Sequence, residues 1–338
     1  MLLRPFPFIF QWVQSEITIV AMLFRRIKNF VDFPSRLRAM EQSLARIGTQ
    51  LDEAKILAAK TSIQHNERKG VVERLCEVEF KVFSQFGDDG IIQYLIHHLQ
   101  PVPDSFIEFG VQDYRESNTR FLLLNNNWRG LVIDGREDYI RSIQNDDIYW
   151  RYTLTAHCAF IDRDNIDMLI RDAGFVGEVG LLSIDIDGND YWIWEELSVV
   201  NPVIVIIEYN SIFGPNWAVT IPYDPTFVRH RAHFSGVFWG ASLKALALLG
   251  ERKGYSLIGC NSSGNNAYFV RKDRVGMFPV YSAEQAFVDA RFRESRDKKG
   301  TLNFRTGEER FREIEAMEVY DVAHNQLIPL QALRNGEE

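Results

Sequence analysis

Three carboxylates and an amide follow a short apolar run within the segment Leu181 to Tyr191. The side chains concerned are Asp185, Asp187, Asn189 and Asp190. Burying charge beside a core strand is costly unless the carboxylates are hydrogen-bonded, protonated or bound to a cation. We therefore expect a ligand at this strand end. The alternative is that Asp187 and Asn189 only cap the helix that follows.

A second polar group, Glu208 with Asn210, follows the next apolar run, Val203 to Ile207. Neighbouring parallel strands end at the same edge of a sheet, so this group should meet the first one there. Two interpretations stay open. Asp187, Glu208 and Asn210 offer the hard oxygen ligands that Mg²⁺ prefers. Without a metal, Asp187 or Glu208 acts as a general base while the others bind hydroxyls of a polar molecule.

A glycine turn and two acids outline a further binding site nearer the N-terminus. The apolar strand that contains Glu108 turns at Gly110 and leads into a helix near Asn118. A ligand can approach the backbone closely at a glycine, and the start of a helix offers free N–H donors. The next strand ends at Asp134, which is placed to accept both hydroxyls of a ribose.

Two kinds of nucleotide ligand fit such a site to different degrees. A dinucleotide is disfavoured, because its glycine fingerprint has glycines where this chain has Gln112 and Asp113 or nearby bulky residues. S-Adenosylmethionine needs an acid for its amino group, backbone for its carboxylate and an acid for its ribose. Glu108, Gly110 and Asp134 meet that description.

From Val78 onward, short apolar runs alternate with amphipathic stretches, which predicts an α/β domain on a parallel sheet. The expected helices span 88–99, with Asp88 or Asp89 as its cap, 118–126, and 242–251, ended by Gly254 in a left-handed cap. The expected strands span 105–109, 130–134, 152–158, 181–185, 203–209, 255–260 and 267–271. The last two flank a loop rich in turn formers and should form an antiparallel hairpin.

The order of these motifs resembles that of the FkbM-type S-adenosylmethionine-dependent methyltransferases. Their first motif is similar to Glu108 to Asn118, their acidic second-strand end is similar to Asp134, and their Asp-x-Glu-Gly segment is similar to Asp185 to Gly188. The resemblance covers Ser84 to Arg271. It implies a Rossmann-like class I methyltransferase fold, which is an α/β fold with a mostly parallel seven-stranded sheet and a C-terminal antiparallel hairpin.

The residues at the strand ends, taken together with the resemblance, predict roles for individual side chains. The cofactor-binding set is Glu108, Gly110, Asn118, Asp134 and Asp185. The catalytic set is Asp187, Glu208 and Asn210, which are also the ligands if Mg²⁺ is used. The chain departs from the family at Gln112 and Tyr114, where the first motif often has small residues, so the path of that loop is not given by the resemblance.

The first 70 residues are predicted to be a helical extension. Residues from Leu37 to Ala58 carry apolar side chains at alternating steps of three and four, which is the seam of a coiled coil and indicates either self-association or packing on the protein's own core. The apolar stretch Ile17 to Phe24, followed by Arg25 and Arg26, is too short and too interrupted to span a bilayer. It allows a peripheral membrane contact by an interfacial helix.

The composition of the chain indicates which classes of partner it can bind and in which cellular compartment it is expected. A net charge of −8 argues against nucleic acid, which normally requires a concentrated basic face. The three cysteines are far apart and indicate neither a zinc site nor a disulfide framework, so a reducing compartment such as the cytoplasm is expected, with membrane association through the N-terminus as a variant. The expected division is a helical or coiled-coil extension (1–70), a methyltransferase domain (78–280) and a charged helical tail (281–338).

The leading hypothesis is an S-adenosylmethionine-dependent O-methyltransferase of a hydroxylated polar acceptor, which is a small molecule, a sugar or a glycan. The long segment after Glu208 should form a lid or a binding wall, whose aromatic side chains stack on a sugar face. Arg229, His230, Arg231 and His233 in that segment suit an anionic acceptor. Two alternatives stay open: a catalytically silent methyltransferase fold that acts as a scaffold, and a nucleotide-dependent oxidoreductase.

Overall fold

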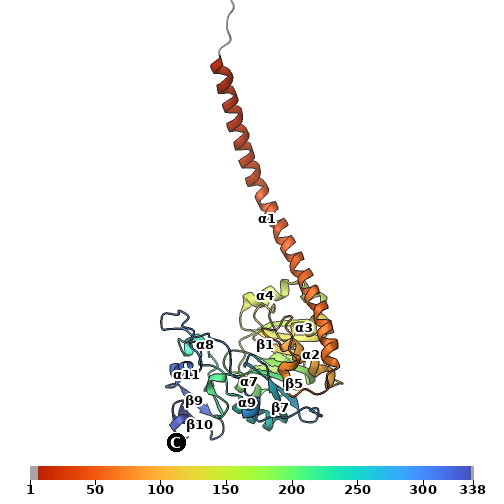
Figure 1. The fold of residues 1–338 in the computed structure, drawn as a ribbon, viewed down its shortest axis with the longest axis vertical. Helices are drawn as coiled ribbons and strands as arrows, with labels where there is room; N and C mark the ends of the chain where they lie inside the picture. The colour runs from red at the N-terminus through yellow and green to blue at the C-terminus, as the bar shows by residue number, and fades with distance from the viewer. Residues whose placement is uncertain (1–6, 336–338) are drawn as a thin grey trace, which may run out of the picture. The chain divides into compact units, whose positions relative to one another are not determined.

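The computed structural model describes residues 7–335, and before residue 35 it describes the side chains of Met22 and Phe33 alone. The chain divides into two compact units, one up to Leu57 and one from Ala58 onward (Figure 1). Helix α1 (Pro7–Glu67) runs through the first unit and supplies the first residues of the second. The predicted membrane contact at Ile17 to Phe24 depends on side chains of which the structure describes Met22 alone. Within residues 7–335, no helix is long and apolar enough to span a membrane.

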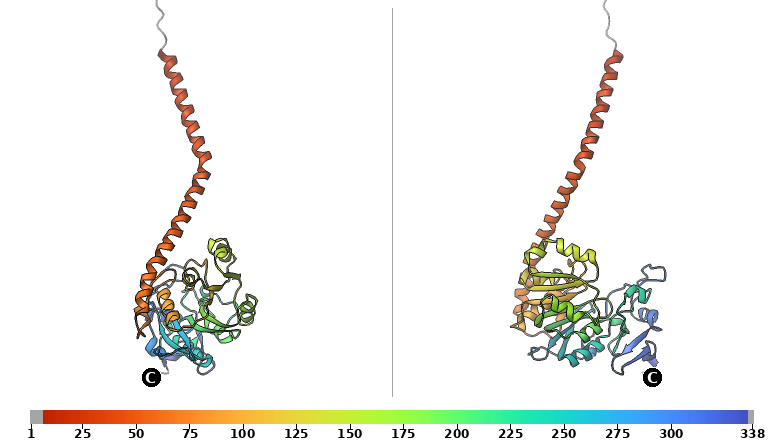
Figure 2. Two further views of the ribbon diagram at one scale, coloured as in Figure 1. Left: turned by 90° about the vertical axis from the view of Figure 1, so that its right-hand side faces the viewer. Right: turned by 180° about the vertical axis from the view of Figure 1, so that it is seen from behind.

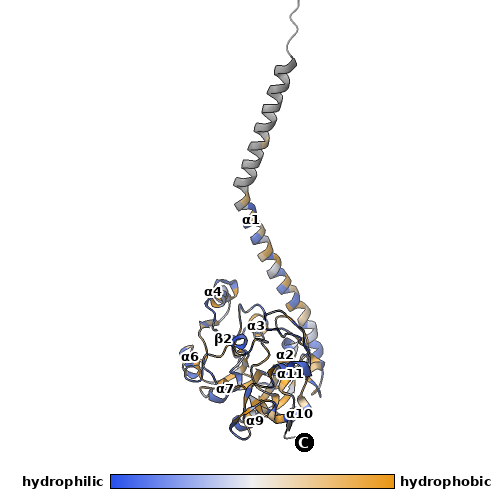
Figure 3. Ribbon diagram, turned by 90° about the vertical axis from the view of Figure 1, so that its left-hand side faces the viewer, coloured by the Kyte–Doolittle hydropathy of each residue, from blue (hydrophilic) through white to orange (hydrophobic). Residues whose placement is uncertain are grey.

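The first unit presents an uncovered apolar stripe. Polar and apolar positions alternate along the described part of α1 (Figure 3). The stripe consists of Leu37, Met40, Leu44, Ile47 and Leu51. Each of these side chains is between 45% and 66% exposed. The apolar side chains of the predicted seam are therefore exposed along this part of α1, and self-association through them stays a prediction.

The second unit is built on a seven-stranded sheet in the order β3-β2-β1-β4-β5-β8-β7 (Figures 1 and 2). Its strands are β1 (Ser105–Phe109), β2 (Arg129–Asp134), β3 (Leu154–Cys158), β4 (Gly177–Ile184), β5 (Val200–Glu208), β7 (Tyr255–Cys260) and β8 (Asn266–Arg271). Strands β1 to β5 pair in parallel, whereas β8 is antiparallel to both β5 and β7. The predicted fold class, a mostly parallel α/β sheet closed by an antiparallel hairpin, is confirmed.

Helices cover both faces of this sheet, because successive strand residues point to opposite sides. Ile107 and Phe109 of β1 pack in a cluster with α6, α7 and α9, whereas Phe106 packs in a second cluster with α2, α3 and α4. These helices are α2 (Asp88–His98), α3 (Arg120–Asn126), α4 (Glu137–Asn145), α6 (Ile166–Asp172), α7 (Asp190–Glu196) and α9 (Leu243–Lys253), and a short α5 (Asp147–Arg151) follows α4. Both faces are thus buried, as a parallel sheet requires.

Three predicted helix ends can be compared with the structure. Gly254 ends α9 in the left-handed conformation with φ +84°, as predicted. Helix α2 begins after Gly87 without a side-chain cap, so the prediction that Asp88 or Asp89 caps it is wrong. The carboxylate of Asp89 instead accepts three backbone N–H groups of residues 82–84, which ties the preceding loop to the helix. Asn189 precedes α7 and makes no side-chain cap either.

The C-terminal part contains a second sheet that the sequence did not predict. It has the order β10-β9-β6, from β6 (Val219–Thr220), β9 (Glu318–Asp321) and β10 (Gln326–Pro329). The predicted helical tail is therefore wrong over these strands, although α10 (Ala283–Ala286), α11 (Glu308–Ile314) and α12 (Ala332–Asn335) are helical. The strands form because β6, about a hundred residues earlier, supplies hydrogen-bond partners to β9. A third apolar cluster, which includes Phe213, Val237 and Phe311, joins the two segments.

Candidate functional site

A cavity of about 570 Å³ lies at the carboxyl ends of β1, β2, β4 and β5. All five residues predicted to bind a cofactor line it: Glu108, Gly110, Asn118, Asp134 and Asp185. Asp187 and Glu208, which were predicted to be catalytic, line it as well. The fold therefore brings together seven of the eight predicted site residues, at the edge where ligands bind in open parallel sheets.

Gly110 ends β1 at a point where the chain has no room for a side chain. Its φ is +74°, and a Cβ atom built there would lie 1.6 Å from the backbone carbonyl oxygen of Asp185. Its amide donates to the carbonyl of Ile133 at 3.0 Å. The end of β1 is thus held between the ends of β2 and β4, and only glycine permits this approach.

The loop after Gly110 adopts left-handed backbone at two residues that are not glycine. Gln112 has φ +49° and Tyr114 has φ +62°, which are the positions where the chain departs from the family motif. The Gln112 amide donates to Asp134 Oδ2 at 2.8 Å, and the buried Tyr114 hydroxyl contacts Thr119 Oγ1 at 3.0 Å. These contacts hold a backbone path that L-residues rarely adopt.

Glu108 fastens this loop to the sheet. Its carboxylate accepts hydrogen bonds from the Asn118 amide at 2.8 Å, the Thr119 amide at 3.1 Å and the Thr119 hydroxyl at 2.5 Å. Burial raises the pKa of Glu108, although these hydrogen bonds oppose the shift. The Asn118 side chain then reaches Ser183 Oγ on β4 at 3.1 Å, so Asn118 spans the cavity wall between β1 and β4.

Asp134 is anchored by the backbone but keeps acceptor capacity. Its Oδ1 accepts the Arg136 amide at 2.9 Å, and its Oδ2 accepts the Gln112 amide at 2.8 Å. Burial raises the pKa of Asp134, and these two hydrogen bonds counteract the rise. Each carboxylate oxygen has a second lone pair, so the group can also accept two neighbouring hydroxyls of a ligand.

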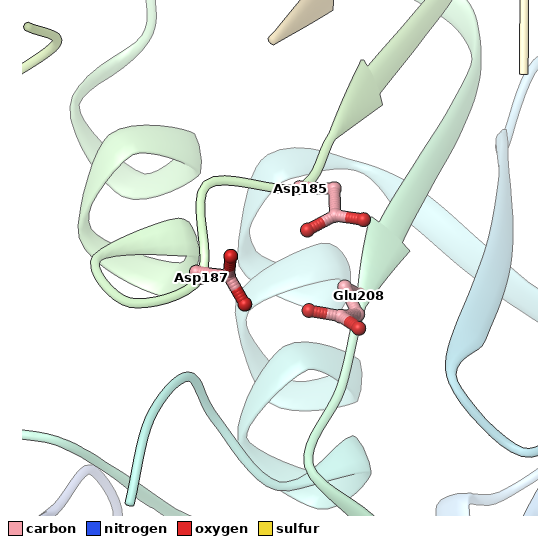
Figure 4. Close-up of side chains that lie close together, drawn as sticks. All are labelled: Asp185, Asp187 and Glu208. Atoms are coloured by element: carbon pink, nitrogen blue, oxygen red, sulfur yellow. The ribbon is translucent and has the colours of Figure 1, made fainter. Parts of the chain in front are cut away.

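Three carboxylates meet on the opposite side of the cavity (Figure 4). Asp185, Asp187 and Glu208 each offer an oxygen that lies within 4.8 Å of the others. Burial, followed by the neighbouring carboxylates, raises the pKa values of Asp185 and Glu208 well above their ordinary range. Glu208 Oε2 is buried and has no hydrogen-bond partner among residues 7–335. A proton or a cation at this cluster relieves the repulsion.

The turn that carries Asp187 is held by two other residues. The buried carboxylate of Asp190 accepts the amides of Ile186 at 2.8 Å and Gly188 at 2.9 Å, and burial raises the pKa of Asp190 to about 6. Asp187 adopts φ +56° and projects an exposed carboxylate to Arg229, with 2.7 Å between Arg229 Nη1 and Asp187 Oδ1. Asp190 therefore shapes the turn, whereas Asp187 faces the cavity.

Arg229 of α8 (Arg229–Ala232) is a site residue whose partner the sequence did not reveal. Its guanidinium pairs with Asp187, donates to the Gly236 carbonyl and lies over the Trp239 ring, 5.1 Å from the centroid. The positive charge also acts on Glu208, whose pKa it lowers against the larger effect of burial. The acidic cluster is thus partly neutralised by the protein itself.

Asn210 is the one predicted site residue that the structure removes from the cavity lining. It is buried, its amide nitrogen donates to the carbonyls of Val237 and Trp239 at 3.0 Å each, and its oxygen accepts the Ile212 amide at 3.1 Å. Its hydrogen-bonding groups are therefore occupied in a loop. The predicted catalytic and metal-binding role of Asn210 is therefore wrong. The third residue beside Asp187 and Glu208 is Asp185.

Several lining residues were not predicted. Tyr139 and Phe160 border the Asp134 side, and Phe227 and Glu294 border the Asp187 side. The Phe227 ring lies so close to Gly188 that a Cβ atom on this glycine would be 2.4 Å from it. Other aromatics of the segment after β5, such as Phe213 and Trp239, are buried rather than available for stacking on a ligand. Phe160 follows β3 closely, and that proximity to a strand end is the signal that could have found it.

Comparison with known proteins gives only distant likenesses. No family profile matches the chain, and no curated protein matches it by sequence. The N-terminal domain of EvdMO1 with S-adenosylhomocysteine bound is 10% identical and matches 56% of this chain and 80% of its own, with a TM-score of 0.36. The O-methyltransferase from Bacillus cereus, also with S-adenosylhomocysteine, is 13% identical and matches 62% and 89%, with a TM-score of 0.37. At these TM-scores the likenesses establish no shared activity.

Proposed function

We propose that this chain is an S-adenosylmethionine-dependent O-methyltransferase of a hydroxylated polar acceptor, most consistent with a sugar or glycan. The observation that carries the proposal is a single cavity in which the Gly110 turn and Asp134 face the Asp187–Glu208 cluster across the ends of four strands. Its volume, about 570 Å³, falls within the range of roughly 300–1,000 Å³ that is usual for small-molecule sites.

The cofactor side fits a nucleoside with a zwitterionic arm. Asp134 has free lone pairs for ribose hydroxyls, and Phe160 and Tyr139 offer ring faces or edges for a base. Gly110 lines the cavity, and the close approach of its backbone to the Asp185 carbonyl holds the Asp185 side of the cavity beside the end of β1. A pyrophosphate would instead need several free amides, yet the Gln112 amide is already bound to Asp134. This disfavours the dinucleotide-dependent oxidoreductase.

Bound S-adenosylmethionine supplies a methyl group on a positively charged sulfur, which an oxygen nucleophile displaces. The chain must therefore hold an acceptor hydroxyl in line and remove its proton. We assign proton removal to Glu208, because its carboxylate lies beside Asp185 and Asp187 and its buried Oε2 has no partner within the described residues. Asp187, fixed by Arg229, is assigned to acceptor orientation, and Asp185 to the cofactor's amino group.

A divalent cation is an additional element of the proposal. Asp185, Asp187 and Glu208 present hard oxygen ligands within 4.8 Å of one another, and the partnerless Glu208 oxygen is consistent with a cation there. Mg²⁺ at this cluster would lower the pKa of an acceptor hydroxyl. The Arg229 ion pair is the competing arrangement, since it already neutralises part of the charge.

The acceptor side is polar, which supports a sugar-like molecule. Glu294, Asn189 and Asn265 line the same cavity as Phe227. Carboxylates and amides satisfy hydroxyl groups, and an aromatic ring packs against the apolar face of a sugar.

Isothermal titration of the full chain with S-adenosylhomocysteine tests the proposal. We expect micromolar binding that Asp134→Ala weakens strongly, because the ribose loses its acceptor. Asp138→Ala is the matched control, since this exposed carboxylate pairs with Arg136 and does not line the cavity. Absence of binding by folded protein would reject the methyltransferase and favour the scaffold, and tighter binding of NADH would favour the oxidoreductase. Turnover with EDTA and with added Mg²⁺ then decides the metal.

A further inference from the structure

A second cavity, of about 530 Å³, adjoins the acceptor side of the first. His230 lines both cavities, next to the Arg229 that holds Asp187. The remaining lining residues are Phe234, Arg296, Asp297, Lys298 and Gly300. A molecule whose hydroxyl lies at Asp187 and Glu208 can therefore extend past His230 into this second cavity, which is open to solvent.

The second cavity is basic in a chain whose net charge is −8. Its single carboxylate, on Asp297, is occupied by its own turn, because Oδ1 accepts the amides of Lys299 at 2.8 Å and Thr301 at 3.0 Å. Arg296 is fixed by donation from Nη1 to the Gly300 carbonyl at 3.0 Å. Arg296 Nη2 also lies 3.7 Å from Glu294 Oε1, so Arg296 is held at the cavity by two contacts, and Asp297 is engaged through one of its two oxygens.

Lys298 is the most available of these cations. Its Nζ lies 5.7 Å from the centroid of the Phe234 ring, and no carboxylate among the described side chains lies at ion-pair distance from it. Its positive field extends to His233, whose pKa is lowered first by burial and further by Lys298. A cation above an aromatic ring and beside a fixed guanidinium is a suitable arrangement for a phosphate or a carboxylate.

We propose that this second cavity binds an anionic group of the acceptor, so that the substrate is a hydroxylated molecule carrying a phosphate or a carboxylate. This inference rests on the proposed methyltransferase function and adds the charge class of its substrate. The reactive hydroxyl lies at the carboxylate cluster, and the anion lies at Lys298 and Arg296, the two cations that line the second cavity.

Calorimetric titration of the full chain saturated with S-adenosylhomocysteine tests this inference. The probes are glucose, glucose 6-phosphate, glucuronate and inorganic phosphate. We expect at least one anionic sugar to bind about tenfold or more tightly than glucose, as a charge-assisted hydrogen bond provides. A gain for glucose 6-phosphate alone identifies phosphate as the group, and a gain for glucuronate alone identifies carboxylate.

Two lysine variants show whether the cavity causes the preference. Lys298→Gln should remove the tenfold gain, whereas Lys299→Gln, an equal charge change at an exposed neighbour outside the cavity, should keep it. Equal affinity for glucose and both anionic sugars, failure of both anionic sugars to bind, or equal effects of the two variants would overturn the inference. Absent S-adenosylhomocysteine binding, measured in the first step, would instead reject the proposed function.

An independent observation concerns helix α1. The exposed stripe from Leu37 to Leu51 repeats at heptad spacing, and Arg36 and Glu41 flank it. In a parallel pair of such helices, Arg36 of one copy faces Glu41 of the other at the flanking positions that set partner choice. We infer that a second copy of this chain covers the stripe in a parallel coiled coil.

Sedimentation equilibrium of the full chain measures this association, and the expected mass is twice the chain mass of 39.2 kDa. Leu44→Lys should yield monomers, whereas Ala45→Lys, an exposed position outside the seam, should not. Glu41→Arg should weaken the pair, and adding Arg36→Glu should restore it. A monomeric wild-type chain, or a double variant as weak as Glu41→Arg, would overturn the inference.

Discussion

Replacing Gly110 with alanine should impair both the stability of the sheet and cofactor binding. The left-handed backbone at φ +74° costs an L-residue about 1–2 kcal/mol. The new Cβ would also lie 1.6 Å from the Asp185 carbonyl oxygen, so β1 and the β4 end must separate. Overpacking of this kind costs about 1–3 kcal/mol. The free energy of unfolding should therefore fall by about 2–5 kcal/mol in total.

Gly254→Ala separates the two contributions. Gly254 has φ +84°, but apart from its neighbours in the chain no atom lies within 4 Å of a Cβ built there. A side chain at Gly254 therefore has only the cost of the left-handed backbone conformation. In urea unfolding, Gly110→Ala should lose at least about 1 kcal/mol more than Gly254→Ala. It should also bind S-adenosylhomocysteine more weakly, because Asp185 is displaced, while Gly254→Ala binds normally. Equal stability losses in the two variants, or full affinity in Gly110→Ala, would refute the reasoning.

Three further predictions concern single side chains. Burial raises the pKa of Asp89 from its ordinary 3.8 to about 6, so the folded chain binds this proton more tightly than the unfolded chain does. The free energy of unfolding should therefore fall by about 3 kcal/mol as the pH rises from about 4 to 6. Urea unfolding of Asp89→Asn at pH 4 and 7 should lack this loss, and an unchanged pH dependence would contradict the burial argument. Asn210→Ala should lower the free energy of unfolding by about 2–4 kcal/mol, because two backbone carbonyls and one backbone amide lose their hydrogen-bond partner. The affinity for S-adenosylhomocysteine should stay unchanged, and a loss of affinity without a loss of stability would return Asn210 to the site. Glu208→Gln should lower kcat about 100-fold or more with cofactor affinity maintained, and normal turnover would remove Glu208 from proton transfer.

Strand positions could be predicted well because their signals are local. The bounds of β1 and β7 match the expected ranges 105–109 and 255–260, since each is an apolar run between turn-forming residues. The convergence of Glu108, Asp134 and Glu208 also followed from a general rule about parallel strand ends. Residue type and strand order together were enough for this part of the site.

The failures concern contacts between residues far apart in the chain. Asp88 looked like a helix cap, but it accepts hydrogen bonds from Asn261 and Tyr268, which are 173 and 180 residues away. Asn210 follows a strand end, as the other predicted site residues do, yet its side-chain amide donates to the backbone carbonyls of Val237 and Trp239. Local sequence patterns contain no information on such partners. The same holds for Arg229 and Asp187, whose pairing depends on the fold of the whole segment after β5.

The pairing of β6 with β9 has a consequence for synthesis of the protein. The seven-stranded sheet is complete once Arg271 has been made, so the Asp134 side of the cavity can form while the chain is still growing. The segment that carries Phe227 and Arg229 shares its apolar cluster with Phe311 and Leu330, which emerge from the ribosome only after the whole seven-stranded sheet. A nascent chain would thus acquire the Asp134 side of the cavity well before it acquires the walls on the Asp187 side.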